Sequence, residues 1–316
     1  MSWMLWLLIG LLILVIILLT ATIIYFFRFA VVRSKFSFDI SKPENVKGTQ
    51  FEPFSELVSK SMEYMNLQSC EEVTIKSHDG LNLYGRIFNV EDSKGTIILA
   101  HGYRSLGNND FCSVIEFFSS CGFNLLVIDQ RAHGKSEGRY IGFGVLERHD
   151  LKRWIEYVNQ RFGEEKPIFL DGVSMGSTTV LMTSGFELPS NVKGIIADCG
   201  FTSPYEICKT VMVRDLKLPK NSPLLPMVSG FCKIVAGYSF KEYSTLDALK
   251  TNKIPVIFVH GDKDGFVPVE MTYQNYEACT AEKELFIAEG AAHGTSYLAY
   301  PEECQQRLVN FFEKYS

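Results

Sequence analysis

The chain has 316 residues, enough for one large domain or two small ones, and a formal net charge of −5. This negative charge argues against a general nucleic-acid-binding protein. The eight cysteines stand at irregular spacings without a C-x-x-C pair, which indicates buried, reduced thiols rather than a disulfide framework or a zinc site.

The amino-terminal segment Met1 to Phe27 is apolar and carries no charged side chain. At about 1.5 Å per residue it is long enough to cross a hydrocarbon core of about 30 Å. A cleaved signal peptide is the alternative, but that usually has a basic amino end and a shorter apolar stretch. Arg28, Arg33 and Lys35 follow the span and no basic residue precedes it. The positive-inside rule therefore predicts an uncleaved single-pass anchor with the body of the protein in the cytoplasm.

Composition divides the chain into three parts. Residues 1–33 form the anchor and its basic flank, residues 34–71 a mixed polar linker, and residues 72–316 one large domain. A short amphipathic helix is predicted in the linker around Pro53 to Tyr64. We expect this linker to let the domain stand off the membrane.

Strand and helix signals alternate from Glu72 onward. Asp79-Gly80 predicts a hairpin between strands at 73–77 and 81–88. Further strands are predicted at 96–100, 124–129, 168–170, 192–197, 254–259 and 285–288, and helices at 109–121, 145–162 and 297–315. Continuous apolar strands between helices predict an α/β fold whose mostly parallel sheet is covered on both faces. Ligands bind such sheets beyond the carboxyl ends of the strands.

One insert, at about residues 201–252, separates two strands by more than a crossover helix needs. It mixes apolar residues and prolines with basic residues such as Lys209, Arg214 and Lys217. A single crossover helix with a long loop is the ordinary interpretation. Loops of this length in compact domains are usually functional, so we favour a small helical cap over the site.

The most informative motif is Gly172-Val173-Ser174-Met175-Gly176, which lies between a predicted strand and a predicted helix. A G-x-S-x-G turn in this context is typical of a nucleophile elbow, which presents the serine hydroxyl at the carboxyl end of the strand. Ser174 is therefore the candidate nucleophile. The amide of Met175 is expected to point toward the same space.

A serine hydroxyl needs a neutral imidazole as base and a carboxylate to hold that imidazole. Among six histidines, His293 is the candidate base, because it lies between small residues in the loop after the last strand. Asp264, after the strand at 254–259, is the candidate acid, with Asp262 as the alternative that more simply bonds the turn backbone. We expect His260 to pack below the site.

Attack by Ser174 would leave a negative oxygen, which two backbone amides can stabilise in an oxyanion hole. The amide of Met175 is one expected donor. The other is the amide of Tyr103, after the strand at 96–100, where Gly102 lets the backbone turn. His101 is then expected to orient this loop. We interpret Asp129 and Arg131 as groups that tie loops together near the site. His78 and His149 are expected to be solvated.

These motifs resemble those of serine α/β-hydrolases, in the branch of monoglyceride-lipase-like esterases and serine-aminopeptidase-like hydrolases, and especially its membrane-anchored bacterial members. The resemblance covers roughly residues 72–316. It rests on H-G-Y at 101–103, D-x-R-x-H-G-x-S at 129–136, G-x-S-M-G at 172–176, H-G-D-x-D-x-x-V-P at 260–268 and A-H-G at 292–294. It implies the α/β-hydrolase fold, with an eight-stranded type of sheet. Val173 and Ser177 depart from the His and Gly usual in the lipase relatives, which weakens a lipase assignment.

The predicted function is cleavage of carboxylic esters through an acyl-enzyme, on acyl-chain or lipid-like substrates near the membrane. No metal or organic cofactor is expected, and the motifs give no indication of oligomeric state. A serine peptidase or amidase with the same triad is one alternative, since the fold does not fix the substrate. A membrane-bound interaction module without activity is the other.

Overall fold

The computed structural model describes residues 3–34, 40 and 42–316. Lys35, part of the predicted basic flank, lies outside the described residues. An eight-stranded sheet forms the centre, in the order β1-β2-β4-β3-β5-β6-β7-β8. Its strands are β1 (Glu71–Lys76), β2 (Asn82–Phe88), β3 (Gly95–Ala100), β4 (Phe123–Ile128), β5 (Ile168–Val173), β6 (Val192–Asp198), β7 (Val256–Gly261) and β8 (Lys283–Ala288).

The sheet is parallel except at one edge. β1 pairs antiparallel with β2 through the predicted hairpin, and β2 pairs antiparallel with β4. The pairs β3–β4, β3–β5, β5–β6, β6–β7 and β7–β8 are parallel. The mostly parallel α/β sheet predicted from the sequence is therefore confirmed, and each predicted strand is present within three residues of its expected ends.

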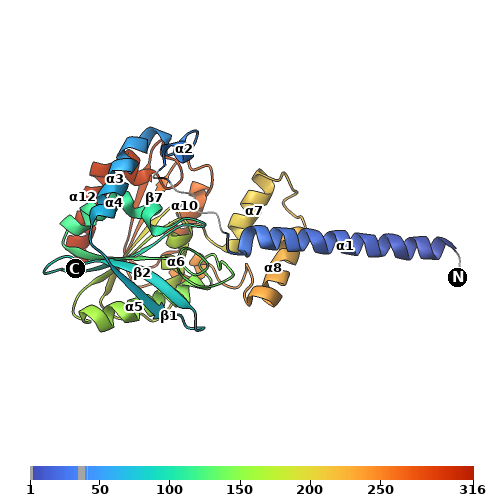
Figure 1. Cartoon of the computed structure of the whole chain (residues 1–316), viewed down its shortest axis with the longest axis horizontal. Helices are drawn as coiled ribbons and strands as arrows, with labels where there is room; N and C mark the ends of the chain where they lie inside the picture. Colours follow the sequence, from blue (N-terminus) through green and yellow to red (C-terminus); the bar gives the residue numbers. More distant parts are fainter. Residues whose placement is uncertain (1–2, 35–39, 41) are drawn as a thin grey trace.

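Helices cover both faces of the sheet (Figure 1). Along β3, Ile97 and Leu99 face one apolar cluster, whereas Ile98 and Ala100 face the other, as the alternation of a strand requires. The first cluster includes residues of α3 (Ser55–Leu67), α4 (Gly107–Ser120), α11 (Ser296–Ala299) and α12 (Pro301–Tyr315). The second includes residues of α5 (Glu147–Phe162), α6 (Met175–Thr183) and α9 (Thr245–Leu249). α10 (Val269–Ala278) follows β7.

The last helix differs from its prediction. One helix was expected over 297–315, but the structure has the short α11 followed by α12, which begins at Pro301. Proline lacks an N–H to donate and restricts the residue before it, so it starts a helix readily and interrupts one poorly.

The segment between the anchor and the sheet packs onto the domain. It contains α2 (Pro43–Val46), the 3₁₀ helix η1 (Glu52–Phe54) and α3, which matches the predicted amphipathic helix. Val58, Met62 and Met65 recur at helical spacing and are buried in the first apolar cluster. The described part of this segment therefore differs from the expected linker, because it packs on the domain instead of separating it from the membrane. Burial of its apolar side chains is more favourable than their exposure to water.

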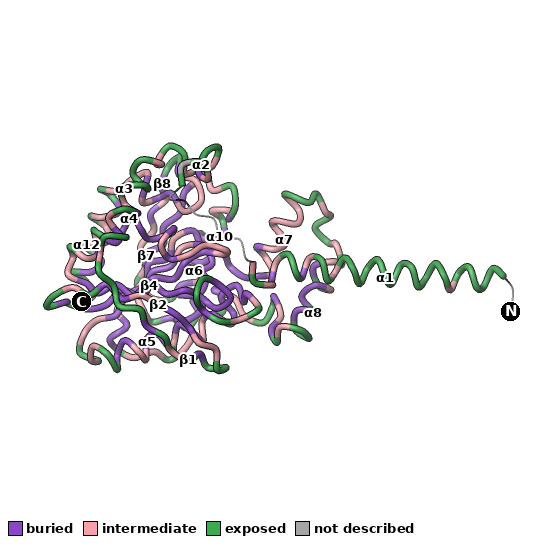
Figure 2. The backbone as a smooth tube through the Cα atoms, viewed as in Figure 1, coloured by how far each residue is buried: buried purple, intermediate pink, exposed green. Residues whose placement is uncertain are grey.

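The insert folds into helices, here called the cap, that meet the amino-terminal helix. α7 (Pro204–Arg214) and α8 (Leu224–Ala236) lie beside α1 (Trp3–Val31) (Figure 1). α1 is long and apolar enough to cross a membrane. It is exposed over most of its length (Figure 2), but Phe27 and Val31 near its end are buried in a third apolar cluster with cap residues such as Val228 and Cys232.

Candidate active site

Ser174 occupies a strained turn between β5 and α6. Its backbone has φ 56° and ψ −113°, a region that a residue with a side chain rarely adopts. The turn is closed by two glycines. A Cβ at Gly172 would lie 2.3 Å from the carbonyl carbon of Gly176, and a Cβ at Gly176 would lie 1.7 Å from the carbonyl oxygen of Ala100. Only glycine fits at either position, so the motif has the geometry of a nucleophile elbow.

The three side chains predicted to form the triad lie together. The Oγ of Ser174 is 3.0 Å from Nε2 of His293, and Nδ1 of His293 is 2.6 Å from Oδ2 of Asp264. Because an ionised carboxylate only accepts, Nδ1 carries the proton toward Asp264 and the lone pair of Nε2 faces the Ser174 hydroxyl. This arrangement can remove a proton from Ser174.

Asp264 is enclosed and held from several directions. Its side chain is inaccessible to solvent, and Oδ1 accepts the amides of Phe266 and Val267 at 2.7 and 2.8 Å. Burial alone raises the pKa of a carboxyl group, but the hydrogen bonds from His260 and His293 hold the pKa of Asp264 well below its usual range. The group is therefore a carboxylate at neutral pH.

His260 has a larger role than the packing role expected of it. Its Nε2 lies 3.0 Å from Oδ2 of Asp264, while its Nδ1 lies 2.6 Å from Oγ1 of Thr272. His260 is completely buried and thus orients Asp264 directly, rather than only packing below the site. The available signal was its position at the end of β7, four residues before the candidate acid.

The loop after β3 lies beside the nucleophile. A Cβ at Gly102 would be only 3.4 Å from the Cβ of Ser174. The next residue is Tyr103, and the amide of Met175 is the first of α6. Among the described residues, neither of these amides donates a hydrogen bond, so both remain available to an incoming oxygen.

Two buried histidines shape this loop, as the sequence predicted for His101. Nε2 of His101 accepts the amide of Gln130 at 3.0 Å, and its Nδ1 lies 2.8 Å from the carbonyl of Gly102. Nε2 of His133 accepts the amide of Arg104 at 3.0 Å. Burial lowers the pKa of His133 to about 3, so this ring stays neutral and can accept.

Three further polar residues have the loop contacts expected of them. Asp129 accepts the amide of Lys135 at 2.8 Å, and Arg131 pairs with Asp150 at 2.5 Å and with Asp79 at 3.0 Å, so both residues tie loops together as expected. Oδ1 of Asp262 accepts the amide of Gly290 at 2.5 Å, which is the turn role considered for it.

His78 is exposed as predicted, whereas His149 is half-buried, so the prediction of a solvated ring holds only in part for His149. The two rings lie 4.7 Å apart, and His149 also lies 5.0 Å from the ring of Phe186. Burial, followed by the nearby charge of Arg148, lowers the pKa of His149 to about 4. The sequence neighbours of His149 on α5 are polar, which suggested a solvated ring. The ring of Phe186, which packs on it, comes from a loop distant in the sequence.

Within the part of the chain that the structure describes, two groups of side chains have ligand atoms close enough for a metal ion. One is Cys199 with Asp264 and His293, and the other is His78 with Asp79 and Asp150. Burial raises the pKa of Cys199 well above its ordinary value, so its thiol is a poor ligand at neutral pH. The carboxylates of the second group are already paired with Arg131. The expectation of no metal ligand and no cofactor-binding residue stays a prediction.

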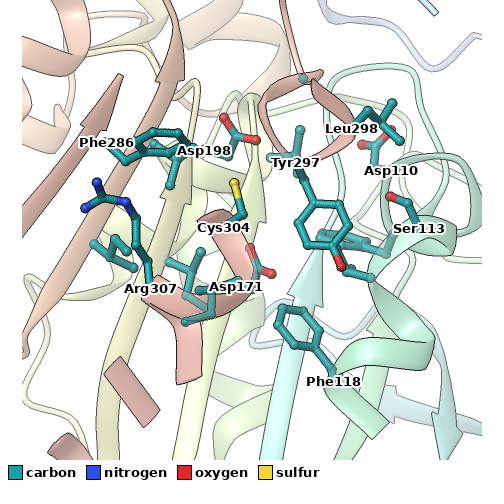
Figure 3. Close-up of a pocket in the computed structure, with 18 residues that line it drawn as sticks. Asp110, Ser113, Phe118, Asp171, Asp198, Phe286, Tyr297, Leu298, Cys304 and Arg307 are labelled. Carbon is teal, nitrogen blue, oxygen red and sulfur yellow. The ribbon is translucent and has the colours of Figure 1, made fainter. Parts of the chain in front are cut away.

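A cavity of about 60 Å³ lies on the α4–α12 face of the sheet (Figure 3). Val173 and Gly294, the neighbours of Ser174 and His293, line it, but Ser174 and His293 do not. The carboxyl groups of Asp171 and Asp198 point into it, with Cys304 between them (Figure 3). Burial raises the pKa of Asp198 to about 6, and one of its oxygens is buried without a hydrogen-bond partner among the described residues.

Comparison with known proteins agrees with this architecture. A family model described as the alpha/beta hydrolase fold matches residues 95–224. The structure of the Pyrococcus furiosus esterase Pf2001 is similar with a TM-score of 0.65 and 26% identity, covering 81% of this chain and 93% of that one. The fold expected from the resemblance is confirmed.

Two relatives by sequence extend the comparison. The Bacillus subtilis protein YqkD is 29% identical over 283 residues, which cover 89% of this chain and 88% of that protein. A monoacylglycerol lipase of Mycolicibacterium smegmatis is 24% identical over 211 residues, covering 56% of this chain and 73% of the lipase. Together with the family model, these matches support placing the chain in the α/β-hydrolase superfamily.

Proposed function

We propose that this chain, which has the α/β-hydrolase fold, is a serine hydrolase that cleaves carboxylic esters through an acyl-enzyme. The observation that carries the proposal is the continuous hydrogen-bonded path from Ser174 through His293 to Asp264, with spacings of 3.0 and 2.6 Å. Nucleophile, base and orienting acid occur along the chain in the order typical of this fold.

The geometry supports a two-step reaction. Ser174 Oγ attacks the ester carbonyl carbon as Nε2 of His293 takes its proton, and the amides of Tyr103 and Met175 stabilise the oxyanion. The C–O bond to the alcohol then breaks, and His293 returns the proton to the departing oxygen. A water molecule, deprotonated by the same nitrogen, attacks the acyl carbon, and Ser174 is released with a carboxylic acid. Asp264 stays ionised and keeps His293 in the required tautomer.

Several features support an ester with an acyl chain as the substrate. Ser174 is only 4% exposed, and the adjoining third cluster, which contains Met175 and residues of the cap, is apolar. The esterase and the lipase among the similar proteins agree with ester cleavage. The cap also contains basic residues that would suit an anionic head group, among them Lys217, while Lys209 and Arg214 pair with Glu206 and Asp215. These points make the enzyme carboxylesterase-like or lysophospholipase-like.

We further propose that α1 is an uncleaved, single-pass membrane anchor and that the catalytic domain is cytoplasmic. The burial of Phe27 and Val31 against the cap supports retention, because cleavage after the apolar segment would expose their partners to water. The substrate would then be met at the membrane surface.

Hydrolysis of p-nitrophenyl esters of increasing chain length tests the proposal. We expect turnover to rise beyond the acetate ester, and Ser174→Ala to lower kcat by about 10⁴-fold or more. A rate that is flat or falls beyond acetate would contradict the acyl-chain substrate. Faster cleavage of aminoacyl p-nitroanilides than of any ester would assign a peptidase instead.

A further inference from the structure

The carboxyl end of α1 is capped by the catalytic domain. The last carbonyls of a helix have no partner within it and must be satisfied elsewhere. Here the hydroxyl of Tyr103 donates to the carbonyl of Ala30 at 2.9 Å, the guanidinium of Arg104 donates to the carbonyl of Phe29, and the amide of Ile141 donates to the carbonyl of Val31 at 2.7 Å. Two of these three donors come from the loop after β3, beside Ser174.

Tyr103 therefore has two separate functions in one residue. Its amide is the proposed oxyanion donor, and its hydroxyl is fixed to the end of α1. The ring stacks on Phe143 with centroids 5.1 Å apart, and burial raises the pKa of Tyr103 above its ordinary value. The hydroxyl consequently stays protonated and remains a hydrogen-bond donor at any physiological pH.

The backbone on either side of Tyr103 is also held. The amide of Gly102 donates to Oδ2 of Asp110 at 2.6 Å, and the amide of Arg104 donates to His133 at 3.0 Å. Arg104 has φ 55°, a left-handed conformation that a non-glycine residue keeps only when its surroundings impose it. Its guanidinium lies 5.4 Å from the centroid of the Phe29 ring, where the negative end of the α1 dipole favours a cation.

We propose that the end of α1 is a positioning element of the oxyanion hole. By accepting the hydrogen bonds of Tyr103 and Arg104, it fixes the direction of the Tyr103 amide, so full turnover requires α1 to be seated on the domain. The membrane helix is on this view part of the catalytic apparatus as well as an anchor. This inference rests on the proposed serine-hydrolase function.

The test uses Tyr103→Phe in the full chain, reconstituted in phospholipid nanodiscs. The variant keeps the amide and the ring and loses only the hydroxyl. We expect kcat for a p-nitrophenyl ester to fall about tenfold, with KM and thermal stability nearly unchanged, because a displaced donor loses transition-state stabilisation rather than ground-state binding. Tyr140→Phe is the matched control, since the Tyr140 ring also packs on α1, at Phe27.

The affinity for a trifluoromethyl ketone inhibitor is a second measurement, one that a purely structural effect of the substitution would leave unchanged. Ser174 adds to its carbonyl to give an oxyanion in the same hole, so its affinity should fall in Tyr103→Phe by the same factor as kcat/KM. If Tyr103→Phe proves unstable, Arg104→Gln provides the second variant, and we expect a smaller parallel loss in both quantities.

Two results would overturn the inference while leaving the hydrolase intact. One is turnover by both variants equal to that of the wild type. The other is a fall in stability and turnover without a matching fall in affinity for the trifluoromethyl ketone. Failure of the wild type to hydrolyse any ester would instead overturn the proposed function, and the inference with it.

Discussion

The Asp264 carboxylate accepts four hydrogen bonds, two on each oxygen, from Phe266, Val267, His260 and His293. A carboxylate held this way cannot rotate, so the orientation of His293 follows from the folding of the loop after β7. Its depressed pKa also links folding to pH. The contribution of Asp264 to the free energy of unfolding is complete above the pKa that this carboxyl group has in the unfolded chain, near 4. That contribution is lost as the pH falls toward the lower pKa of Asp264 in the folded protein.

Asp198 shows the opposite linkage. Its folded pKa, raised to about 6 mainly by burial, lies above the unfolded value, so the folded state binds the proton more tightly. The protein is therefore stabilised by this group at low pH and loses that contribution as pH rises through about 6. At neutral pH the ionised carboxylate is a buried charge with one unpartnered oxygen.

Replacement of Asp198 by Asn should remove the loss of stability that the buried charge causes at neutral pH. We expect the free energy of unfolding at pH 7.5 to rise by about 1–3 kcal/mol, and the gain to disappear at pH 4, where the wild-type carboxyl is protonated. Thermal denaturation at the two pH values measures the difference. An equal shift in Tm at both would show that burial does not raise the pKa of Asp198.

Among the elements, the elbow between β5 and α6 depends most on backbone geometry. Gly176→Ala would place a methyl group within 1.7 Å of the Ala100 carbonyl oxygen, at a contact between two buried backbone segments that cannot separate. We expect a loss of about 3 kcal/mol or more in stability and of most esterase activity, because the strand and helix must move apart.

Gly230→Ala in α8 is the matched control. A Cβ at Gly230 meets no atom within 4 Å, and the residue lies inside a helix, where alanine is the better helix former. We expect stability to stay equal or rise by up to about 1 kcal/mol. Similar losses from both substitutions, measured by thermal denaturation, would mean that close packing at the elbow is not what excludes a side chain at Gly176.

For the helices and strands, the sequence predicted well where each element lies, but poorly which other elements it packs against. The parallel strands are marked by apolar runs, the edge hairpin is marked by Asp79-Gly80, and the spacing of Val58, Met62 and Met65 marks α3. The face that α3 covers is not encoded locally, because the α4 side chains it meets are buried only once the sheet has formed. For the same reason His260 was left as a packing residue: its bond to Asp264 depends on how the loop after β7 closes.

Over the whole molecule, the domain, the cap and the end of α1 form one packed unit. The motifs predicted which residues meet at the carboxyl edge of the sheet, because parallel strands bring their ends together. They contained no sign that Tyr103 reaches the carbonyl of Ala30. Contacts between segments more than 70 residues apart come from tertiary packing, which a single sequence does not display.

The proposed orientation can be tested with Cys70, an exposed free cysteine directly before β1. If the domain is cytoplasmic, a membrane-impermeant maleimide should label the protein in lysed cells but not in intact ones. Cys70→Ser separates this signal from that of the less accessible thiols. Labelling in intact cells that Cys70→Ser removes would place the domain on the outer side.

Covalent labelling of the wild-type protein with a fluorophosphonate, followed by peptide mass mapping, tests the central claim most directly. The arrangement of Ser174 and His293 predicts a single adduct, on the peptide that contains Ser174, formed in the wild type and absent from Ser174→Ala. His293→Gln should slow its formation by several orders of magnitude, because no base then takes the proton. A wild-type protein that gives no adduct, or an adduct at another residue that persists in Ser174→Ala, would contradict the account.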